Sequence, residues 1–306
     1  MSEKTAVVVG VDGSEHSLRA LEWALGAAHH LEAPLTIAHV RPEALQLGSA
    51  RIASLGPAPA IPDTVLNGLA AGMGTKAEGL DVRYTSLDGS VVDALTGAAR
   101  DARLLVVGSR GRGGFKSLLL GSTSRNLVAA ASCPVVVVPH EARAASLEGW
   151  AKAGRVLLGL HTEETPDEVV DFAFEAARLR GVSLEVVTAY PVPPNPLLLI
   201  GAPAPALQVP PPMPDETPEL VASTSRSQEE RLAPFTARYP EVELVRTVTP
   251  VDAAGRLVED SQEAGLVVVG RHRRHRVETL LVGSVAHAVL HHAACPVAVV
   301  PPVEQS

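Results

Sequence analysis

Three short motifs occur twice in this chain, and the two copies are separated by a constant distance. The copies are Val106–Gly111 and Val268–Arg273, Gly121–Ser124 and Gly283–Ala286, and Cys133–Pro139 and Cys295–Pro301. The offset is 162 residues in each case, because 270 − 108, 283 − 121 and 295 − 133 give the same value. A constant offset over three motifs indicates a tandem duplication, so the chain is expected to fold as two similar units.

The length of the chain fits this division. Half of 306 residues is close to the commonest size of a compact domain. We expect a first domain at residues 1–140, a linker at 141–152 and a second domain at 153–303. Hydrophobic residues make up 46% of the sequence, so each domain has enough apolar side chains to bury a core of its own.

Valine-rich runs alternate with longer segments of helical periodicity in both halves. Runs such as Val7–Val9 and Val135–Val138 are continuously apolar, which is typical of strands buried on both faces of a parallel sheet. The alternation predicts an α/β fold with two tandem doubly wound domains, each a five-stranded parallel sheet flanked by helices. Ligands of such folds bind beyond the carboxyl ends of the strands, where the strand order reverses.

These runs predict the individual elements. Strands are expected at 5–11, 35–40, 81–86, 103–107 and 134–138, and at 155–160, 183–189, 242–248, 265–269 and 296–300. Helices are expected at 14–31, 91–101 and 122–131, and at 166–180, 219–238, 252–263 and 284–293. Two proline-rich stretches, 41–62 and 191–218, follow the second strand of each half and cannot continue a helix or a central strand. They fit loops at the ligand-binding edge and variable insertions without a role equally well.

Charge and composition argue against several classes of protein. The net charge of −8 disfavours nucleic acid as a partner, and 3% aromatic residues disfavour a stacking platform for single strands. No stretch approaches the roughly 20 apolar residues of a membrane span, and the N-terminal apolar run is too short for a signal peptide. We therefore expect a cytoplasmic protein. Cys133 and Cys295 precede prolines at equivalent repeat positions and are interpreted as small buried residues.

A glycine-rich segment of the first half has the pattern of a phosphate site. Gly108 and Gly111 follow a strand, where glycine permits a sharp turn and close approach of a ligand. Gly121 then opens a helix whose free N–H groups and dipole attract an anion. The hydroxyls of Ser122 and Ser124 can donate to phosphate oxygens, although Ser122 can equally cap the helix. Together the two motifs favour binding of a nucleotide phosphate.

Asp12 ends the first predicted strand, at the same edge of the sheet. Its carboxylate can hold a ribose hydroxyl, an adenine amino group or a metal ion, or it can cap the helix that begins near Ser14. The glycine loop nearby favours a role in ligand binding. The chain has neither the Gly-Lys-Ser/Thr of a P-loop nor the glycine pattern of a dinucleotide-binding turn after this strand.

The residues now described resemble the universal stress protein family, of the tandem-domain type. The resemblance is carried by Gly108-x-x-Gly111-x9-Gly121-Ser122, by Asp12 after the first strand, and by the Cys-Pro-Val-Val-Val-Val-Pro sequence that ends at Pro139. It covers both halves nearly end to end. It implies a five-stranded parallel sheet in each domain and, in one branch of the family, ATP bound at the glycine loop.

The resemblance also implies roles for individual residues. Val11 and Asp12 would lie beside the adenine and ribose, and the main chain of Val40 would meet the adenine. The residues around the phosphates would be Gly108, Gly111, Gly121, Ser122, Thr123 and Ser124. Family members pair through their last strands, and here the two halves would make this pairing internally, between Val135–Val138 and Val297–Val300.

The second half departs from this pattern at three positions. His161 replaces Asp12, Arg273 replaces Gly111 and Ala286 replaces Ser124. The segment from Arg271 to Arg276 is strongly basic, so arginine could hold a phosphate there by charge. A solvated loop in a domain that has lost its site is the preferred interpretation.

These features predict an ATP-binding stress-response regulatory protein. The first domain would hold ATP, with or without Mg, and the second would be structural or regulatory; we assign no catalytic residue and no metal ligand. Its partners would be an adenine nucleotide and an unknown protein, with no nucleic acid and no membrane. Two alternatives stay open: a slow Mg-dependent ATPase in which Asp12 positions the metal, and an interaction module that binds no nucleotide. The chain would be an intramolecular pseudo-dimer, and further homodimer formation stays open.

Overall fold

The structure is a computed structural model that describes residues 5–41, 62–111, 120–139, 154–190, 217–250, 252–271 and 283–302. Several sequence predictions concern residues outside these ranges. They are most of the two proline-rich stretches, at 42–61 and 191–216, the linker at 141–152 and the basic segment at 272–276, including Arg273. The last two residues of the second stretch, Thr217 and Pro218, begin helix α8. The domain limits 1–140 and 153–303 likewise stay predictions.

Ten strands lie within the described residues, five in each half. They are β1 (Val7–Gly10), β2 (Leu35–Val40), β3 (Val82–Leu87), β4 (Leu104–Gly108), β5 (Val135–Val138), β6 (Val156–Gly159), β7 (Leu184–Ala189), β8 (Leu244–Thr249), β9 (Leu266–Gly270) and β10 (Val297–Val300). All of them were predicted, with ends that differ by up to two residues. The valine runs therefore form buried strands at the predicted places in the chain.

The described helices alternate with these strands. They are α1 (Glu15–His30), α3 (Thr64–Met73), α4 (Val91–Ala98), α5 (Ser122–Ala130), α6 (Asp167–Arg180), α8 (Thr217–Arg238), α9 (Ala253–Asp260) and α10 (Ser284–His292), with a short 3₁₀ helix η1 (Gly74–Ala77). α3 and η1 were not among the expected elements, and α4 and α9 end three residues earlier than expected. Among the described helices, none has the length and apolar character that crossing a bilayer requires.

The ten strands form one sheet in the order β3-β2-β1-β4-β5-β10-β9-β6-β7-β8. Within each half all neighbouring strands are parallel, which confirms the predicted fold class. The halves meet where β5 pairs antiparallel with β10, and Val136 stands opposite Ala298. This pair, called the seam below, is the internal pairing of last strands that the sequence predicts.

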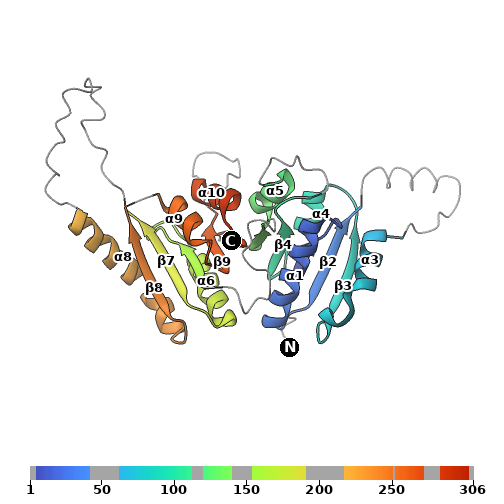
Figure 1. Ribbon diagram of the computed structural model, residues 1–306, viewed down its shortest axis with the longest axis horizontal. Coiled ribbons are helices and arrows are strands. Elements are labelled where there is room, and N and C mark those ends of the chain that lie inside the picture. Colours follow the sequence, from blue (N-terminus) through green and yellow to red (C-terminus); the bar gives the residue numbers. More distant parts are fainter. Residues whose placement is uncertain are drawn as a thin grey trace, which may run out of the picture.

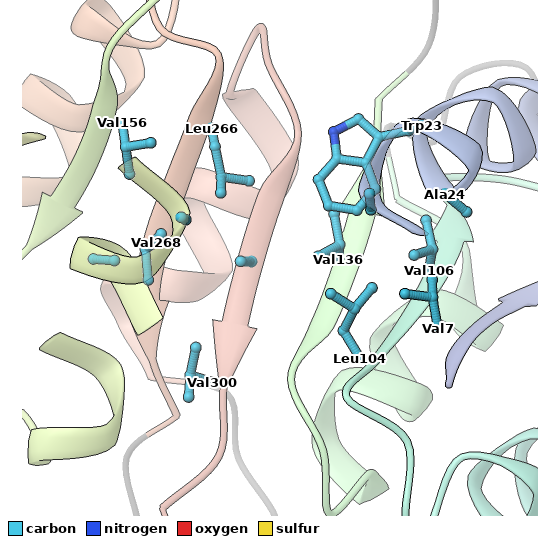
Figure 2. Close-up of a cluster of buried hydrophobic side chains, with 14 of the residues drawn as sticks. Val7, Trp23, Ala24, Leu104, Val106, Val136, Val156, Leu266, Val268 and Val300 are labelled. Carbon is cyan, nitrogen blue, oxygen red and sulfur yellow. The ribbon is translucent and has the colours of Figure 1, made fainter. Parts of the chain in front are cut away.

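Two layers of helices cover the sheet, and each layer encloses a core that continues across the seam (Figure 1). One core packs α1, α3, α6 and α8 against the sheet, and the other packs α4, α5, α9 and α10 against the opposite face. Figure 2 shows part of the first core, with Val106 and Val136 on first-half strands and Val268 and Val300 on second-half strands. The two halves therefore share their apolar cores.

Polar and aromatic contacts on the α1 and α6 side also join the halves. Arg103, just before β4, forms an ion pair with Glu175 of α6 at 2.5 Å. The guanidinium of Arg180, at the end of α6, lies 5.8 Å from the centre of the Trp23 ring on α1. Burial lowers the pKa of Arg180 to about 10, a value at which the group stays charged at neutral pH. This cation therefore contributes a buried cation–π contact across the seam.

The two cysteines occupy equivalent buried positions before β5 and β10. Both are free thiols, and burial raises the pKa of Cys133 to about 11 and that of Cys295 to about 12. The reactive thiolate form is therefore scarce at neutral pH. Their interpretation as small buried residues is confirmed by this burial.

The packing of β4 against α1 generates a first prediction. A Cβ added at Gly108 would lie 2.8 Å from the backbone C and O of His16, so we expect Gly108→Ala to lower the unfolding free energy by about 1–3 kcal/mol. A Cβ added at Gly97, an exposed residue of α4, would have no neighbour within 4 Å. We therefore expect Gly97→Ala to raise the unfolding free energy by about 0.5–1 kcal/mol. Urea denaturation of both variants checks this, and equal midpoints would contradict it.

Candidate functional site

The predicted site residues of the first half gather at the carboxyl ends of β1, β2 and β4. The chain runs outward from β1 through β2 and β3 and returns to β4 on the other side of β1, so the strand order reverses between β1 and β4. Val11 directly follows β1, and its N–H donates to Ala38 O at 2.8 Å. Asp12 and Gly108 therefore flank the switch point, where doubly wound sheets bind ligands, with Val40 at the end of the adjacent β2.

Asp12 and Gly111, far apart in the sequence, lie against each other. A Cβ added at Gly111 would lie 2.7 Å from Oδ2 of Asp12, so a side chain there would displace the carboxylate. Oδ1 of Asp12 accepts hydrogen bonds from the N–H of Ser14 at 2.9 Å and from its hydroxyl at 2.6 Å. These bonds hold the carboxylate in a defined orientation at the end of β1.

Ser14, not Asp12, caps helix α1. Its side-chain oxygen accepts a hydrogen bond from the N–H of Ser17, and the helix begins at Glu15. The alternative interpretation of Asp12 as a helix cap is therefore wrong. The carboxylate supports the cap residue instead and lies next to the glycine loop.

The loop after β4 returns to the end of that strand. The N–H of Gly121 donates to Ser109 O at 2.8 Å, which brings the start of α5 beside Gly108. A Cβ added at Gly121 would lie 3.4 Å from Ser109 O, an ordinary contact. Gly108 and Gly111, at and just after the end of β4, and Gly121, which bonds back to Ser109, are together called the glycine cradle below.

The first turn of α5 is open to solvent. Gly121 occupies the N-cap and has no side chain to bond the first N–H groups, while Ser122 and Thr123 are exposed. Ser122 is the first helical residue, so the alternative that it caps the helix is wrong. The turn carries no acidic residue. An uncapped, uncharged N-terminus of this kind attracts an anion through its N–H groups and dipole.

The hydroxyl of Ser124, which the sequence analysis expects to donate to phosphate, has a different acceptor in the structure. The side chain is buried, and the hydroxyl donates to Gly108 O at 2.8 Å. A hydroxyl has one proton, so in this arrangement it cannot also donate to a ligand. Ser124 instead ties the first turn of α5 to the end of β4.

The equivalent region of the second half is arranged differently. The N–H of His161 donates to Thr165 Oγ1 at 2.9 Å, and its ring Nδ1 accepts from the N–H of Glu164 at 3.3 Å. The histidine is therefore engaged within its own turn. Ala286 is buried where Ser124 stands in the first half and has no hydroxyl to hold α10. Gly283 still occupies the N-cap of α10.

Sequence reasoning missed a polar cluster next to Val40. Asp63 caps α3 by accepting from the N–H groups of Val65 and Leu66, each at 3.1 Å. It also lies 2.8 Å from His39 Nδ1 on β2 and accepts from the Ser86 hydroxyl on β3 at 2.8 Å. The three side chains are too far apart in sequence to form a motif. The sheet register places His39 of β2 opposite Ser86 of β3, and the start of α3 brings Asp63 to both.

The surroundings of Asp63 favour its ionised carboxylate form. Burial raises the pKa of Asp63, but the hydrogen bonds from His39, Leu66 and Ser86 lower it by more, so the pKa lies below its ordinary value of 3.8. The ionised form therefore anchors α3 beside the end of β2.

Comparison with known proteins identifies the family. The model of the universal stress protein family matches residues 5–139 and again 152–301, which together span nearly the whole chain. The chain belongs to the universal stress protein family. Both copies of the repeat match the family separately, which agrees with the tandem-domain type.

Relatives of the same length occur in mycobacteria. The chain is 33% identical over 311 aligned residues to a universal stress protein of Mycolicibacterium smegmatis, covering 97% of each. It is 34% identical over 309 residues to universal stress protein Rv2005c of Mycobacterium tuberculosis, covering 96% of each. The crystal structure of a universal stress protein from Archaeoglobus fulgidus covers 98% of both chains with a TM-score of 0.64 at 18% identity, which shows the shared fold.

The Ser124 contact generates a second prediction. Ser124→Ala leaves the buried Gly108 carbonyl without its donor, so we expect the unfolding free energy to fall by about 1–3 kcal/mol. Ser122→Ala, two residues earlier on the exposed side of the same turn, should change it by no more than about 0.5 kcal/mol. Denaturant titrations of the two variants measure the difference, and equal stabilities would show that the bond contributes nothing.

The Asp63 cluster generates a third prediction, on pH. Because the folded-state pKa is lowered, the carboxylate stabilises the fold above its unfolded value of 3.8, and this contribution is lost as pH falls through the folded-state pKa. Between about pH 5 and about pH 3, the wild-type unfolding free energy should therefore decrease more steeply than that of Asp63→Asn. Thermal unfolding across this range tests it. Parallel curves would be inconsistent with the lowered pKa.

Proposed function

We propose that this universal stress protein binds ATP in its first half and acts as a stress-response regulator. The observation that carries the proposal is the meeting of the glycine cradle with the open first turn of α5, at the switch point of the sheet. A phosphate chain needs backbone without side chains in the way and N–H donors that no side chain caps. Glycine stands at positions 108, 111 and 121, and Gly121 leaves the first turn of α5 without a side-chain cap. The Asp12 carboxylate, held beside Gly111, supplies an acceptor for the sugar end of the ligand.

Each predicted site residue has a place in this proposal. The glycine cradle and the first-turn residues Ser122 and Thr123 would hold the phosphates. Val11 and Asp12 would lie beside adenine and ribose, and the main chain of Val40 would contact the adenine. Ser124 would act indirectly, by fixing α5 to β4 through its bond to Gly108.

We infer regulation by occupancy rather than turnover. Hydrolysis needs a group that activates water and a group that stabilises the leaving phosphate. Within the described part of the chain, no cluster of three or more His, Cys, Asp or Glu residues could hold a metal ion. Asp12, the one acid among the predicted site residues, accepts two hydrogen bonds from Ser14 at the start of α1. Mg would therefore accompany ATP by binding its phosphates, and nucleotide occupancy would control contact with a protein partner.

The second half would serve a structural or regulatory role. It keeps the strand order and the glycine before α10, but His161 and Ala286 replace two groups that shape the first site. Arg273, which replaces Gly111, would place a long side chain at a position where the first half has none. We therefore propose one nucleotide per chain.

The fourth prediction tests this stoichiometry. Purified protein, stripped of nucleotide, should bind Mg-ATP at one site per chain in a calorimetric titration. Gly121→Val should abolish binding, because a branched side chain would stand beside the first-turn N–H groups of α5 while its Cβ makes only an ordinary contact. The matched control is Gly283→Val at the equivalent N-cap of α10, which should bind ATP like the wild type.

Each other result has a definite meaning. Two sites, one lost in each variant, would show that the basic segment of the second half also holds phosphate. No site in the wild type would favour an interaction module that binds no nucleotide. Phosphate release that depends on Asp12 over many turnovers would favour the ATPase.

A further inference from the structure

Arg271 follows β9 in the second half, yet its guanidinium lies against a helix of the first half. Its Nη1 lies 3.0 Å from Val128 O, 2.8 Å from Ala129 O and 2.9 Å from Ala131 O. These carbonyls belong to the last turn and the C-cap of α5, the helix whose first turn forms the proposed phosphate site. A cation of the second half thus donates hydrogen bonds to the carbonyls at the end of this first-half helix, across the seam.

The last turn of α5 carries no cation of its own. The last carbonyls of a helix lack partners within the helix, and a positive charge near them is stabilising. α10, the equivalent helix of the second half, carries His291 and His292 in its last turn, whereas the last turn of α5 has no basic residue. Arg271 therefore supplies, from the other half, the positive charge that the last turn of α5 lacks.

The equivalent residue of the first half lacks a side chain that could make the same contact. The residue of the first half that corresponds to Arg271 is Ser109, since 271 − 162 = 109. Its short side chain is buried, and its hydroxyl has no hydrogen-bond partner among the described residues. At this pair of equivalent positions, only the second half provides a cation that reaches the other half.

α5 is consequently held at both ends by groups outside it. At its first turn the Ser124 hydroxyl bonds Gly108 O of β4, and at its last turn the carbonyls bond Arg271. A helix of nine residues is rigid, so the contact at its end affects where its N-terminal N–H groups point. The placement of the first turn relative to Asp12 and Gly111 thus depends on both halves.

We propose that Arg271 is a positioning residue for the phosphates of the bound nucleotide, and that the second half is in this way a required part of the single site in the first. This inference rests on the proposed function, since it assumes that α5 receives phosphates. Binding energies coupled in this way are reciprocal, so nucleotide at the first turn of α5 also strengthens the contact with Arg271.

The fifth prediction tests this role with two substitutions and a matched control. Arg271→Met keeps the aliphatic stem but removes the charge, and it should raise the Kd for ATP about tenfold, a typical size for coupling between separate sites. The Kd for adenosine, which has no phosphate, should change by less than about twofold. Arg271→Lys keeps a cation near the carbonyls and should recover most of the ATP affinity.

Arg103→Met is the control. It removes another charged contact across the seam, the ion pair with Glu175, on the face of the sheet opposite α5. It should leave the affinities for ATP and adenosine unchanged. Calorimetry with ATP and competition with adenosine, after circular dichroism has shown that each variant is folded, supply the measurements.

The outcomes separate this inference from the proposed function. If the wild type binds ATP and Arg271→Met binds it equally well, or if Arg103→Met weakens ATP binding as much, the positioning role is wrong and the ATP site stands. Equal loss of ATP and adenosine affinity would show a merely structural role. If the wild type does not bind ATP, both proposals fail.

A measurement on the unmodified protein covers the case in which Arg271→Met does not fold. Because the coupling is reciprocal, ATP should slow hydrogen exchange at the end of α5 and also in β9 of the second half. Protection confined to the first turn of α5 and the glycine cradle would overturn the inference.

Discussion

β5 and β10 are short runs of buried apolar residues, and each would be the exposed edge of a five-stranded sheet if its half stood alone. Their antiparallel pairing removes both edges and places Val136 opposite Ala298 in the middle of a ten-stranded sheet. The continuous cores on both faces, the contact of Arg180 with Trp23 and the reach of Arg271 to α5 all require this seam.

The seam allows the two copies of one fold to differ in what they contribute. The first keeps the glycine cradle, the open turn of α5 and an oriented Asp12. The second keeps the sheet but has His161 in place of Asp12 and Ala286 in place of Ser124. In our proposal the second copy stabilises the site of the first without binding a ligand itself. The contact that would do this is the set of hydrogen bonds from Arg271 to the carbonyls at the end of α5.

The sequence predicted elements well where local periodicity was strong and less well where it was weak. The buried valine strands and the helices with clear apolar faces were correct to within three residues. α3 was missed because Gly68 and Gly72 lower its helical propensity and a proline-rich stretch precedes it. The hydrogen bond from the Ser124 hydroxyl to Gly108 O was not predicted, because the two residues are 16 positions apart in the sequence.

The sequence by itself determined the duplication, the alternation of strands and helices, and the order of glycines that suits a phosphate. These follow from side-chain periodicity and turn chemistry, which act between near neighbours along the chain. Only the tertiary structure decided which groups meet: Asp12 with Gly111, His39 with Asp63, and Arg271 with the end of α5. Such contacts depend on strand order and on the direction of each helix across the sheet, and no local pattern encodes them.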